Sequence, residues 1–255
     1  WAGPSRPRRT ARGAFVLPPC QRHPCLALNI ANVGGQSTMS YQSVMNRVSD
    51  AAARSGRDLG EITLVAVSKT KTVEEIMSVF EQGHRDFGEN RAQELATKAP
   101  LLPDDIRWHF VGSLQSNKTR VVRPVSHLLH SMDRRSLALA WVKGQGMPPP
   151  VLLQVNVGDE GQKSGAKIEE AGPLVEWMSG LGLDVRGLMA IPPIPDRPEA
   201  SRRYFVMLRE FRDRVSIENP SVVELSMGMT DDFEVAIEEG ASIIRVGRAI
   251  FGPRN

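Results

Sequence analysis

The sequence is poor in cysteine, in tyrosine and in long apolar runs. Its two cysteines, Cys20 and Cys25, both precede Met39, so no disulfide can hold together the part of the chain that follows. No apolar run approaches the roughly 20 residues that a membrane-spanning helix needs. The sequence therefore predicts neither a disulfide-stabilised domain nor an integral membrane protein.

Acidic residues are absent from residues 1–38, which carry five prolines and five arginines: Arg6, Arg8, Arg9, Arg12 and Arg22. Without these five arginines the formal net charge falls from +3 to −2, so the rest of the chain lacks the basic excess of a nucleic-acid-binding protein. The segment could be an organellar transit peptide, or Met39 could be the natural start. We favour the second reading, with residues 1–38 as a disordered or non-native extension and residues 39–255 as the folded domain.

The first apolar run after Met39 ends at a lysine. Residues 62–67 read as a buried strand that stops at Ser68 and Lys69. Thr72 and Glu75 then have the spacing of a capping box that opens a helix. Lys69 is thus predicted at the carboxyl end of a core strand, where its amine could form a Schiff base with an aldehyde. The alternative is a strand-end lysine that only reaches for solvent.

Strands and helices alternate eight times along the rest of the chain, with short loops between them. The predicted strands are residues 62–67, 86–90, 107–112, 125–131, 150–157, 183–191, 222–226 and 242–246. They are apolar on both faces, which is typical of a parallel sheet. Eight such units predict a single (β/α)₈ TIM barrel. An open doubly wound sheet is the alternative, and it is less favoured because no strand shows an edge pattern.

A barrel of this kind gathers the carboxyl ends of its strands on one face. The residues expected there are Lys69, Asn90, His109, Asn156, Met189, Ser226 and Arg245. Arg245 lies inside an apolar strand and needs a partner, either Glu224 in an ion pair or a cofactor ring nitrogen. For His109, a hydrogen-bonded core position is the commoner alternative. The histidines show no zinc spacing and the chain has no calcium motif, so no metal site is predicted.

The loops after the seventh and eighth strands are small and contain glycine. They comprise residues 226–230 and 247–248, and the first leads into a predicted helix. Barrels of this class commonly bind phosphate at these loops through backbone N–H groups. The alternative is that Gly228 and Gly247 only allow tight turns, and for either loop alone this explanation would be preferred. Because both loops occur together, we predict a phosphate site.

Several motifs give the chain a close resemblance to the pyridoxal phosphate (PLP) homeostasis protein family. They are Leu-Val-Ala-Val-Ser-Lys-Thr-Lys (64–71), Phe-Gly-Glu-Asn (87–90), Trp-His-Phe-Val-Gly-Ser-Leu-Gln-Ser-Asn-Lys (108–118), Gly-Leu-Met-Ala-Ile-Pro (187–192), Leu-Ser-Met-Gly-Met-Thr-Asp-Asp (225–232) and Ile-Arg-Val-Gly (244–247). The resemblance runs from about Met39 to Asn255 and does not include residues 1–38.

The resemblance implies a fold like the barrel domain of alanine racemases, with pyridoxal 5′-phosphate held as a Schiff base on Lys69. It also implies that Arg245 faces the pyridine nitrogen and that Asn90 and Met189 line the ring. By the same resemblance, Ser226 and the backbone near Met227, Gly228 and Gly247 hold the phosphate. These eight residues form the predicted cofactor site.

The same resemblance, set beside the residues, favours binding of PLP over catalysis. Racemases of this type use a second base, a tyrosine from an added β-domain, whereas the sequence closes soon after the eighth predicted strand. Its tyrosines, Tyr41 and Tyr204, both lie on predicted helices away from the face. Arg245 at the ring nitrogen would also weaken the cofactor as an electron sink. A racemase-like PLP enzyme is the alternative, and a cofactor-free Schiff-base aldolase is a second one.

The expected protein is therefore a cytoplasmic, monomeric PLP carrier or regulator rather than an enzyme. Its expected partners are PLP itself, PLP-dependent apo-enzymes and PLP-producing enzymes, without nucleic acid or membrane.

Overall fold

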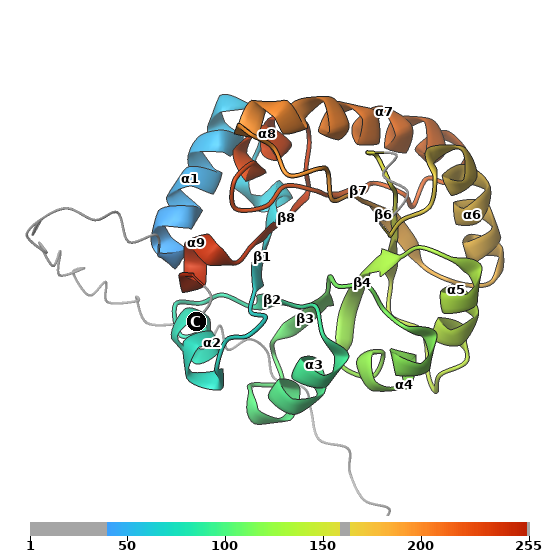
Figure 1. Ribbon diagram of the computed structural model, residues 1–255, viewed down its shortest axis with the longest axis horizontal. Helices are drawn as coiled ribbons and strands as arrows, with labels where there is room; N and C mark the ends of the chain where they lie inside the picture. Colours follow the sequence, from blue (N-terminus) through green and yellow to red (C-terminus); the bar gives the residue numbers. More distant parts are fainter. Residues whose placement is uncertain (1–39, 159–163, 254–255) are drawn as a thin grey trace, which may run out of the picture. The chain divides into compact units, whose positions relative to one another are not determined.

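The structure, a computed structural model, describes residues 40–158 and 164–253 (Figure 1). The predicted extension at residues 1–38, the proposed start at Met39 and most of the loop predicted at residues 158–165 lie outside the described residues. No helix within the described part is long and apolar enough to cross a membrane.

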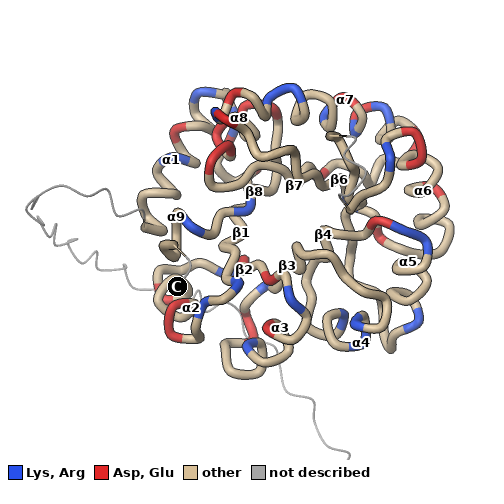
Figure 2. The backbone as a smooth tube through the Cα atoms, viewed as in Figure 1, with Lys and Arg blue, Asp and Glu red and all other residues tan. Residues whose placement is uncertain are grey.

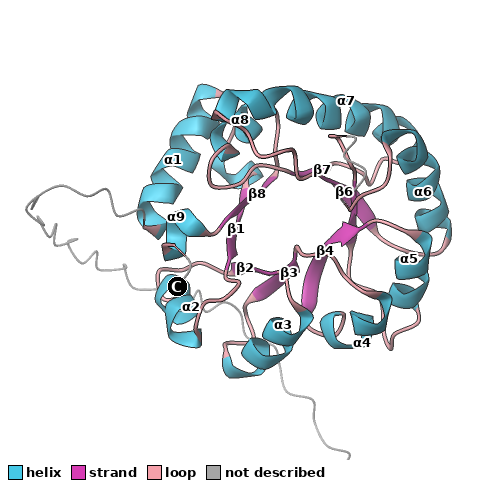
Figure 3. Ribbon diagram, viewed as in Figure 1, coloured by secondary structure: helices cyan, strands magenta, loops and turns pink. Residues whose placement is uncertain are grey.

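Eight parallel strands close into a barrel, with each strand hydrogen-bonded to the next and β8 to β1 (Figure 3). The strands are β1 (Thr63–Val67), β2 (Asp86–Glu89), β3 (Arg107–Phe110), β4 (Ser126–Met132), β5 (Val151–Gln154), β6 (Val185–Met189), β7 (Glu224–Ser226) and β8 (Ile243–Val246). The predicted (β/α)₈ barrel is confirmed, because a closed sheet has no edges and an open doubly wound sheet would have two.

The α-helices form a ring around the barrel (Figure 1). They are α1 (Tyr41–Arg54), α2 (Val73–Phe80), α3 (Ala92–Lys98), α4 (Thr119–Val122), α5 (Arg135–Val142), α6 (Ile168–Gly180), α7 (Arg202–Glu218), α8 (Phe233–Glu238) and α9 (Arg248–Phe251). The predicted capping box is present: the Thr72 side chain accepts from the Glu75 amide, and the Glu75 carboxylate accepts from the Thr72 amide. It begins α2 at Val73, directly after the loop of residues 68–72, and so fixes the length of that loop.

Most of the core lies between the sheet and the helices, and a second, smaller cluster fills the barrel interior. The interior cluster consists of Val65, Leu128, Leu152, Met189 and Ile243. Buried polar side chains share the interior with it, among them His109, His130, Ser226 and Arg245. The interior is therefore partly polar, and those polar groups must satisfy one another.

Two predicted strands differ most from the observed ones, each by four residues. The apolar run at residues 150–157 forms β5 only over Val151–Gln154, after which Val155 makes an isolated bridge to Ala166. The run at residues 183–191 forms β6 only over Val185–Met189. In both cases the residues beyond the strand are still buried, such as Val157 and Ala190. Apolar character therefore continues into the loops above the barrel.

Charged residues of both signs lie side by side on α1, α8 and α7 (Figure 2). Arg202 contacts Glu238 and Glu239 at 2.6 Å each, and Arg47 contacts Glu234 at 2.8 Å. Exposed pairs of this kind contribute little singly, but a connected set ties the last helices of the ring to the first.

Candidate functional site

A cavity of about 1000 Å³ opens where the carboxyl ends of the strands meet. Of the predicted site residues, Lys69, Asn90, Arg245 and Gly247 line it. Met189, Ser226, Met227 and Gly228 are buried and are not among its lining residues. The structure thus brings together the residues from β1, β2 and β8, and places the residues from β6 and β7 beneath or behind them.

Lys69 lies two positions after Val67, the last residue of β1, and is half-buried. Ser68 between them is fully buried. The neighbouring strand β8 packs tightly against this end of β1. A Cβ on Gly247, the residue after β8, would lie 3.0 Å from the Val67 carbonyl oxygen. Any larger residue at position 247 would push β8 away from the strand that carries Lys69.

Behind Lys69 lies a buried ionic cluster from β2 and α3. The Lys98 Nζ donates to Glu89 Oε1 (2.7 Å), Glu94 Oε2 (3.0 Å) and the Ser68 carbonyl oxygen (2.9 Å). Ser68 Oγ also donates to Glu89 Oε1 at 2.8 Å. Burial raises the pKa of Glu89, and the Lys98 and Ser68 hydrogen bonds oppose that rise without cancelling it. This Lys98 cluster fixes the backbone that carries Lys69.

Thr70, the residue after Lys69, has a φ of 64°, a left-handed conformation that is unfavourable for a β-branched residue. Its amide donates to Glu94 Oε2 at 2.7 Å, so the Lys98 cluster holds it in that conformation. We expect Thr70→Asn to raise the free energy of unfolding by about 1 kcal/mol, because asparagine tolerates this region. Urea unfolding measures the change, with Thr97→Asn in helix α3 as the control. A gain no larger than the control would mean that the loop stores no strain.

Asn90 lies at the end of β2 and carries an unsatisfied acceptor. Its Oδ1 is buried and has no hydrogen-bond partner among the described residues. The Asn90 backbone is held by Gly112, where a Cβ would come within 2.2 Å of the Asn90 carbonyl oxygen. Because Asn90 lines the cavity, a ligand donor that reached this oxygen would satisfy it.

Arg245 lies in β8 and is 4% exposed. The alternative of an ion pair with Glu224 does not hold, because Glu224 accepts from Ser242 near the other end of the strands. Arg245 Nη1 donates to Ser226 Oγ (2.6 Å) and Nη2 to the Ala190 carbonyl oxygen (2.9 Å). Burial lowers the pKa of Arg245 to about 10, with Asp232 opposing the shift, so the guanidinium stays charged at neutral pH. Its remaining N–H groups are available to a ligand in the cavity.

The two glycine-bearing loops meet at the cavity. The amides of Thr230 and Gly247, which both line it, donate no hydrogen bond to any described residue. Gly228 has a φ of 86°, and a Cβ there would lie 2.5 Å from the Ala236 side chain, so the tight-turn explanation accounts for this glycine. Two unpaired amides at one end of a cavity suit an anion.

Three further charged residues line this end of the cavity: Arg248, Asp231 and Asp232. Arg248 pairs with Asp231 across its rim at 2.6 Å. Asp232 is buried and turned to its own loop, where it accepts from the Met229 amide and from Ser201.

His109 does not belong to the cavity, and the alternative of a hydrogen-bonded core histidine is confirmed. It is 2% exposed and contacts Asp86, the first residue of β2, through Nε2 at 3.1 Å. It therefore lies in the barrel interior toward the amino ends of the strands. Among the described residues, no group of histidine, aspartate and glutamate side chains could hold a metal ion.

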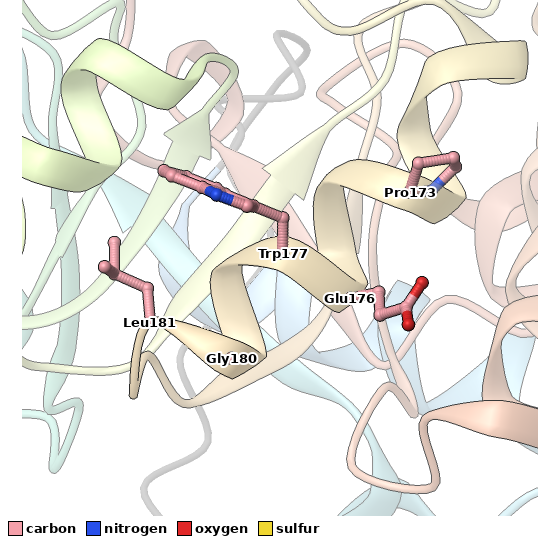
Figure 4. Close-up of a pocket in the computed structure, with 5 residues that line it drawn as sticks. All are labelled: Pro173, Glu176, Trp177, Gly180 and Leu181. Atoms are coloured by element: carbon pink, nitrogen blue, oxygen red, sulfur yellow. The ribbon is translucent and has the colours of Figure 1, made fainter.

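A second hollow lies on the outside of the ring, along helix α6 (Figure 4). Pro173, Glu176, Trp177, Gly180 and Leu181 line it, and all five belong to this helix or its end. The Arg135 guanidinium lies 5.1 Å from the centre of the Trp177 ring. No set of reactive groups converges there, so the cavity at the strand ends is the candidate site.

Sequence reasoning missed much of the cavity wall and its support. The lining includes Gln154 at the end of β5, and Thr70, Val111 and Ile194 in the loops after β1, β3 and β6. The Lys98 cluster was also missed, although Glu89, Glu94 and Lys98 fall at helical and strand positions that face Lys69. A lysine four residues after a glutamate was the available signal, and it is equally typical of an exposed helix.

Comparison with known proteins agrees with this fold. The chain matches the model of the alanine racemase N-terminal domain over residues 42–255. It is 42% identical over 217 residues to a pyridoxal phosphate homeostasis protein of Aquifex aeolicus, covering 83% of this chain and 95% of that protein.

Two solved structures resemble the barrel as well. PipY of Synechococcus elongatus, solved with PLP bound, has a TM-score of 0.70 at 32% identity, covering 82% of this chain and 100% of PipY. An alanine racemase from Corynebacterium glutamicum has a TM-score of 0.65 at 14% identity, covering 85% of this chain and 62% of that one, which shows the shared fold alone. With its motifs, its closed barrel and these levels of identity, the chain belongs to the pyridoxal phosphate homeostasis protein family, within the alanine racemase N-terminal domain fold.

Proposed function

We propose that the chain binds pyridoxal 5′-phosphate, holds it as a Schiff base on Lys69, and supplies it to other proteins. The observation that carries the proposal is the pairing of Lys69 at the end of β1 with Arg245 on β8 in one cavity, on neighbouring strands. An amine and a fixed cation in one cavity suit the two ends of a pyridoxal ring, its aldehyde and its nitrogen. The PLP-bound relative and the shared family name support it.

The residues of the cavity fit the cofactor. Arg245 has N–H groups to spare for the ring nitrogen, Asn90 Oδ1 lacks a donor, and the amides of Thr230 and Gly247 can receive phosphate oxygens. Arg248 stands beside these amides as a further cation.

The other predicted residues act from behind this surface. Met189 packs in the interior cluster, Ser226 holds Arg245, and Met227 with Gly228 sets the course of the loop. Lys69, Asn90, Arg245 and Gly247 therefore keep their predicted roles in the proposed site, whereas the other four support it without lining the cavity.

Bound PLP would supply an aldehyde and an electron-withdrawing ring. The Lys69 amine would attack the aldehyde carbon with loss of one water, and the linkage reverses when water returns. The charged Arg245 would donate to the ring nitrogen and so keep it unprotonated, which would reduce the electron demand of the ring. The chain's own groups thus hold the cofactor without activating it for chemistry on amino acids.

Residues that could catalyse proton transfer are scarce in this cavity. No tyrosine is among its described lining residues. Tyr41 lies on α1 with its ring 5.1 Å from that of His84, and the Tyr204 hydroxyl accepts from Arg203 on α7. The Asp231 carboxylate is paired with Arg248. We therefore propose that racemase-type activity is absent or very weak.

The test uses the purified full chain loaded with PLP. We expect stoichiometric retention of PLP through gel filtration, and transfer of that PLP to a PLP-dependent apo-enzyme, whose activity is restored. In deuterated buffer the loaded protein should exchange no α-proton of common amino acids, because general acid–base help worth about 10²–10⁴-fold is missing. Failure to retain PLP would refute the binding proposal. Multiple-turnover α-deuteration that Lys69→Ala abolishes would instead make the protein an enzyme.

A further inference from the structure

A continuous chain of buried hydrogen bonds leads from Arg245 through the barrel interior. In order it passes through Arg245, Ser226, His130, His109 and Asp86, and we call it the interior chain. Ser226 Oγ lies 2.8 Å from His130 Nδ1, and His130 Nε2 lies 2.9 Å from His109 Nδ1. Ser226 and His130 are fully buried, and His109 is 2% exposed. Every link thus lies where water cannot substitute for a lost partner.

The two ends of the interior chain fix the direction of every hydrogen bond in it. Arginine only donates, so Ser226 Oγ must accept from Arg245 and can give its own proton only to His130 Nδ1. His130 then carries its proton on Nε2 and donates to His109 Nδ1. His109 likewise carries its proton on Nε2 and donates to the Asp86 carboxylate. Both imidazoles are neutral in this arrangement, and each hydrogen has one acceptor.

An additional proton on the imidazole pair would break the pattern. If His109 were doubly protonated, His130 would have to accept at Nε2 and donate from Nδ1 to Ser226. The Ser226 hydroxyl would then receive two hydrogen bonds, and its own hydrogen would have no acceptor among the described residues. Burial lowers the pKa of His130 strongly, and the neighbouring His109, Arg245 and His127 lower it further. Asp86 is itself paired with Arg107 at 2.7 Å and 2.5 Å, which anchors the accepting end.

We propose that His130 and His109 are positioning residues for Arg245, acting through the Ser226 hydroxyl. By accepting the Ser226 proton, His130 turns the oxygen lone pairs toward Arg245 and holds the guanidinium at the floor of the cavity. The consequence for PLP rests on the proposed function, in which Arg245 meets the ring nitrogen. The order of the interior chain itself does not depend on a cofactor.

Nuclear magnetic resonance of the protein without added PLP tests that order. In ¹⁵N-labelled protein, His109 and His130 should both appear as neutral Nε2–H tautomers near neutral pH, and the Arg245 Nη protons should exchange slowly. His130→Leu should release the Arg245 guanidinium, whereas His130→Asn should retain it, because an asparagine oxygen can take the place of Nδ1 and accept from Ser226. His127→Gln is the control: His127 is exposed and packs beside His109 with ring centres 5.6 Å apart, outside the interior chain. An Nδ1–H tautomer at His130, or an Arg245 signal unchanged in His130→Leu, would overturn the proposal.

PLP titration followed by absorbance tests the effect on the cavity. We expect His130→Leu and Ser226→Ala each to weaken PLP binding about tenfold, as the loss of a hydrogen bond to a charged group does. The double variant should bind no more weakly than the single ones, because His130 acts only through Ser226. His127→Gln should bind normally. Losses of PLP affinity that add up in the double variant would contradict the proposal, as would normal PLP binding by His130→Leu. If the wild-type protein binds no PLP but both histidines keep the expected tautomers, only the proposed function is refuted. If His130→Leu fails to fold, Ser226→Ala and His130→Asn give the same contrast.

Discussion

Lys69→Ala should abolish the imine absorbance of the PLP-loaded protein. Lys69 is the strand-end amine in the cavity, half-buried and one residue beyond a fully buried serine. Without it, PLP can be held only through its phosphate and ring, so it should dissociate readily on gel filtration. Borohydride reduction of the wild-type protein, followed by peptide mapping, should place the label on Lys69.

Two other lysines provide the comparison. Lys71 also lines the cavity, but its Nζ donates to Glu75 (3.1 Å) and to the Phe251 carbonyl oxygen (2.9 Å), so its amine is already engaged. Lys118→Ala should leave the absorbance unchanged. Colour that survives Lys69→Ala, with the label on Lys71 or Lys118, would show that the assigned amine is wrong.

Lys98→Met should destabilise the protein by about 3–5 kcal/mol at neutral pH, because it leaves the carboxylate of Glu89 buried without its cation. The side chains of Glu89 and Lys98 are 0% and 11% exposed, and Glu89 Oε2 already lacks a partner among the described residues. Urea unfolding measures the loss. The same variant should lose PLP affinity, since Lys98 also holds the Ser68 carbonyl oxygen next to Lys69.

The loss in Lys98→Met should depend on pH in a stated direction. The pKa of Glu89 is raised above its ordinary 4.5, chiefly by burial, so the folded state binds this proton more tightly than the unfolded state. Stability from this group is present below pH 4.5 and falls as the pH rises through the raised value. Removing Lys98 raises that value further, so the deficit should be small at acid pH and grow toward neutrality.

A matched double variant separates charge from packing in this cluster. Lys98→Met with Glu89→Gln should recover much of the stability, because glutamine is neutral and can still accept from Ser68. Lys143→Met, at an exposed position, should change little. A deficit that does not vary with pH, or that Glu89→Gln fails to reduce, would show that the charge of Glu89 is not its cause.

The fold was predictable from sequence because its signals are local. The alternation of apolar strands with helices, and the capping box at Thr72, depend on residues within a few positions of one another. Strand ends were less predictable: Val155 and Val157 are buried by the loops above β5, so the apolar run continues after the pairing stops. The apolar pattern of a sequence indicates that residues are buried. It does not distinguish burial within a paired strand from burial beneath a loop.

The site was predictable only where one residue carries the signal by itself. Lys69 and Arg245 stand out because a charge occurs at the end of, or within, an apolar strand. The protein partners of Arg245, Ser226 and the Ala190 carbonyl oxygen, were not predicted, because they depend on the register between strands. The β3–β4 pairing shifts register next to His109, and no local pattern in the sequence shows which histidines of β3 and β4 then meet.

The pairing of β1 with β8 has a consequence for synthesis of the protein. Val65 is opposite Arg245 in this pairing, so the first strand of the barrel needs the last one to complete its hydrogen bonds. The ribosome synthesises the chain from its amino end, so Lys69 leaves the ribosome long before Arg245. The PLP site of a nascent chain is therefore incomplete until β8 has been synthesised. The vitamin-derived ligand can stabilise the finished barrel but cannot guide its early folding.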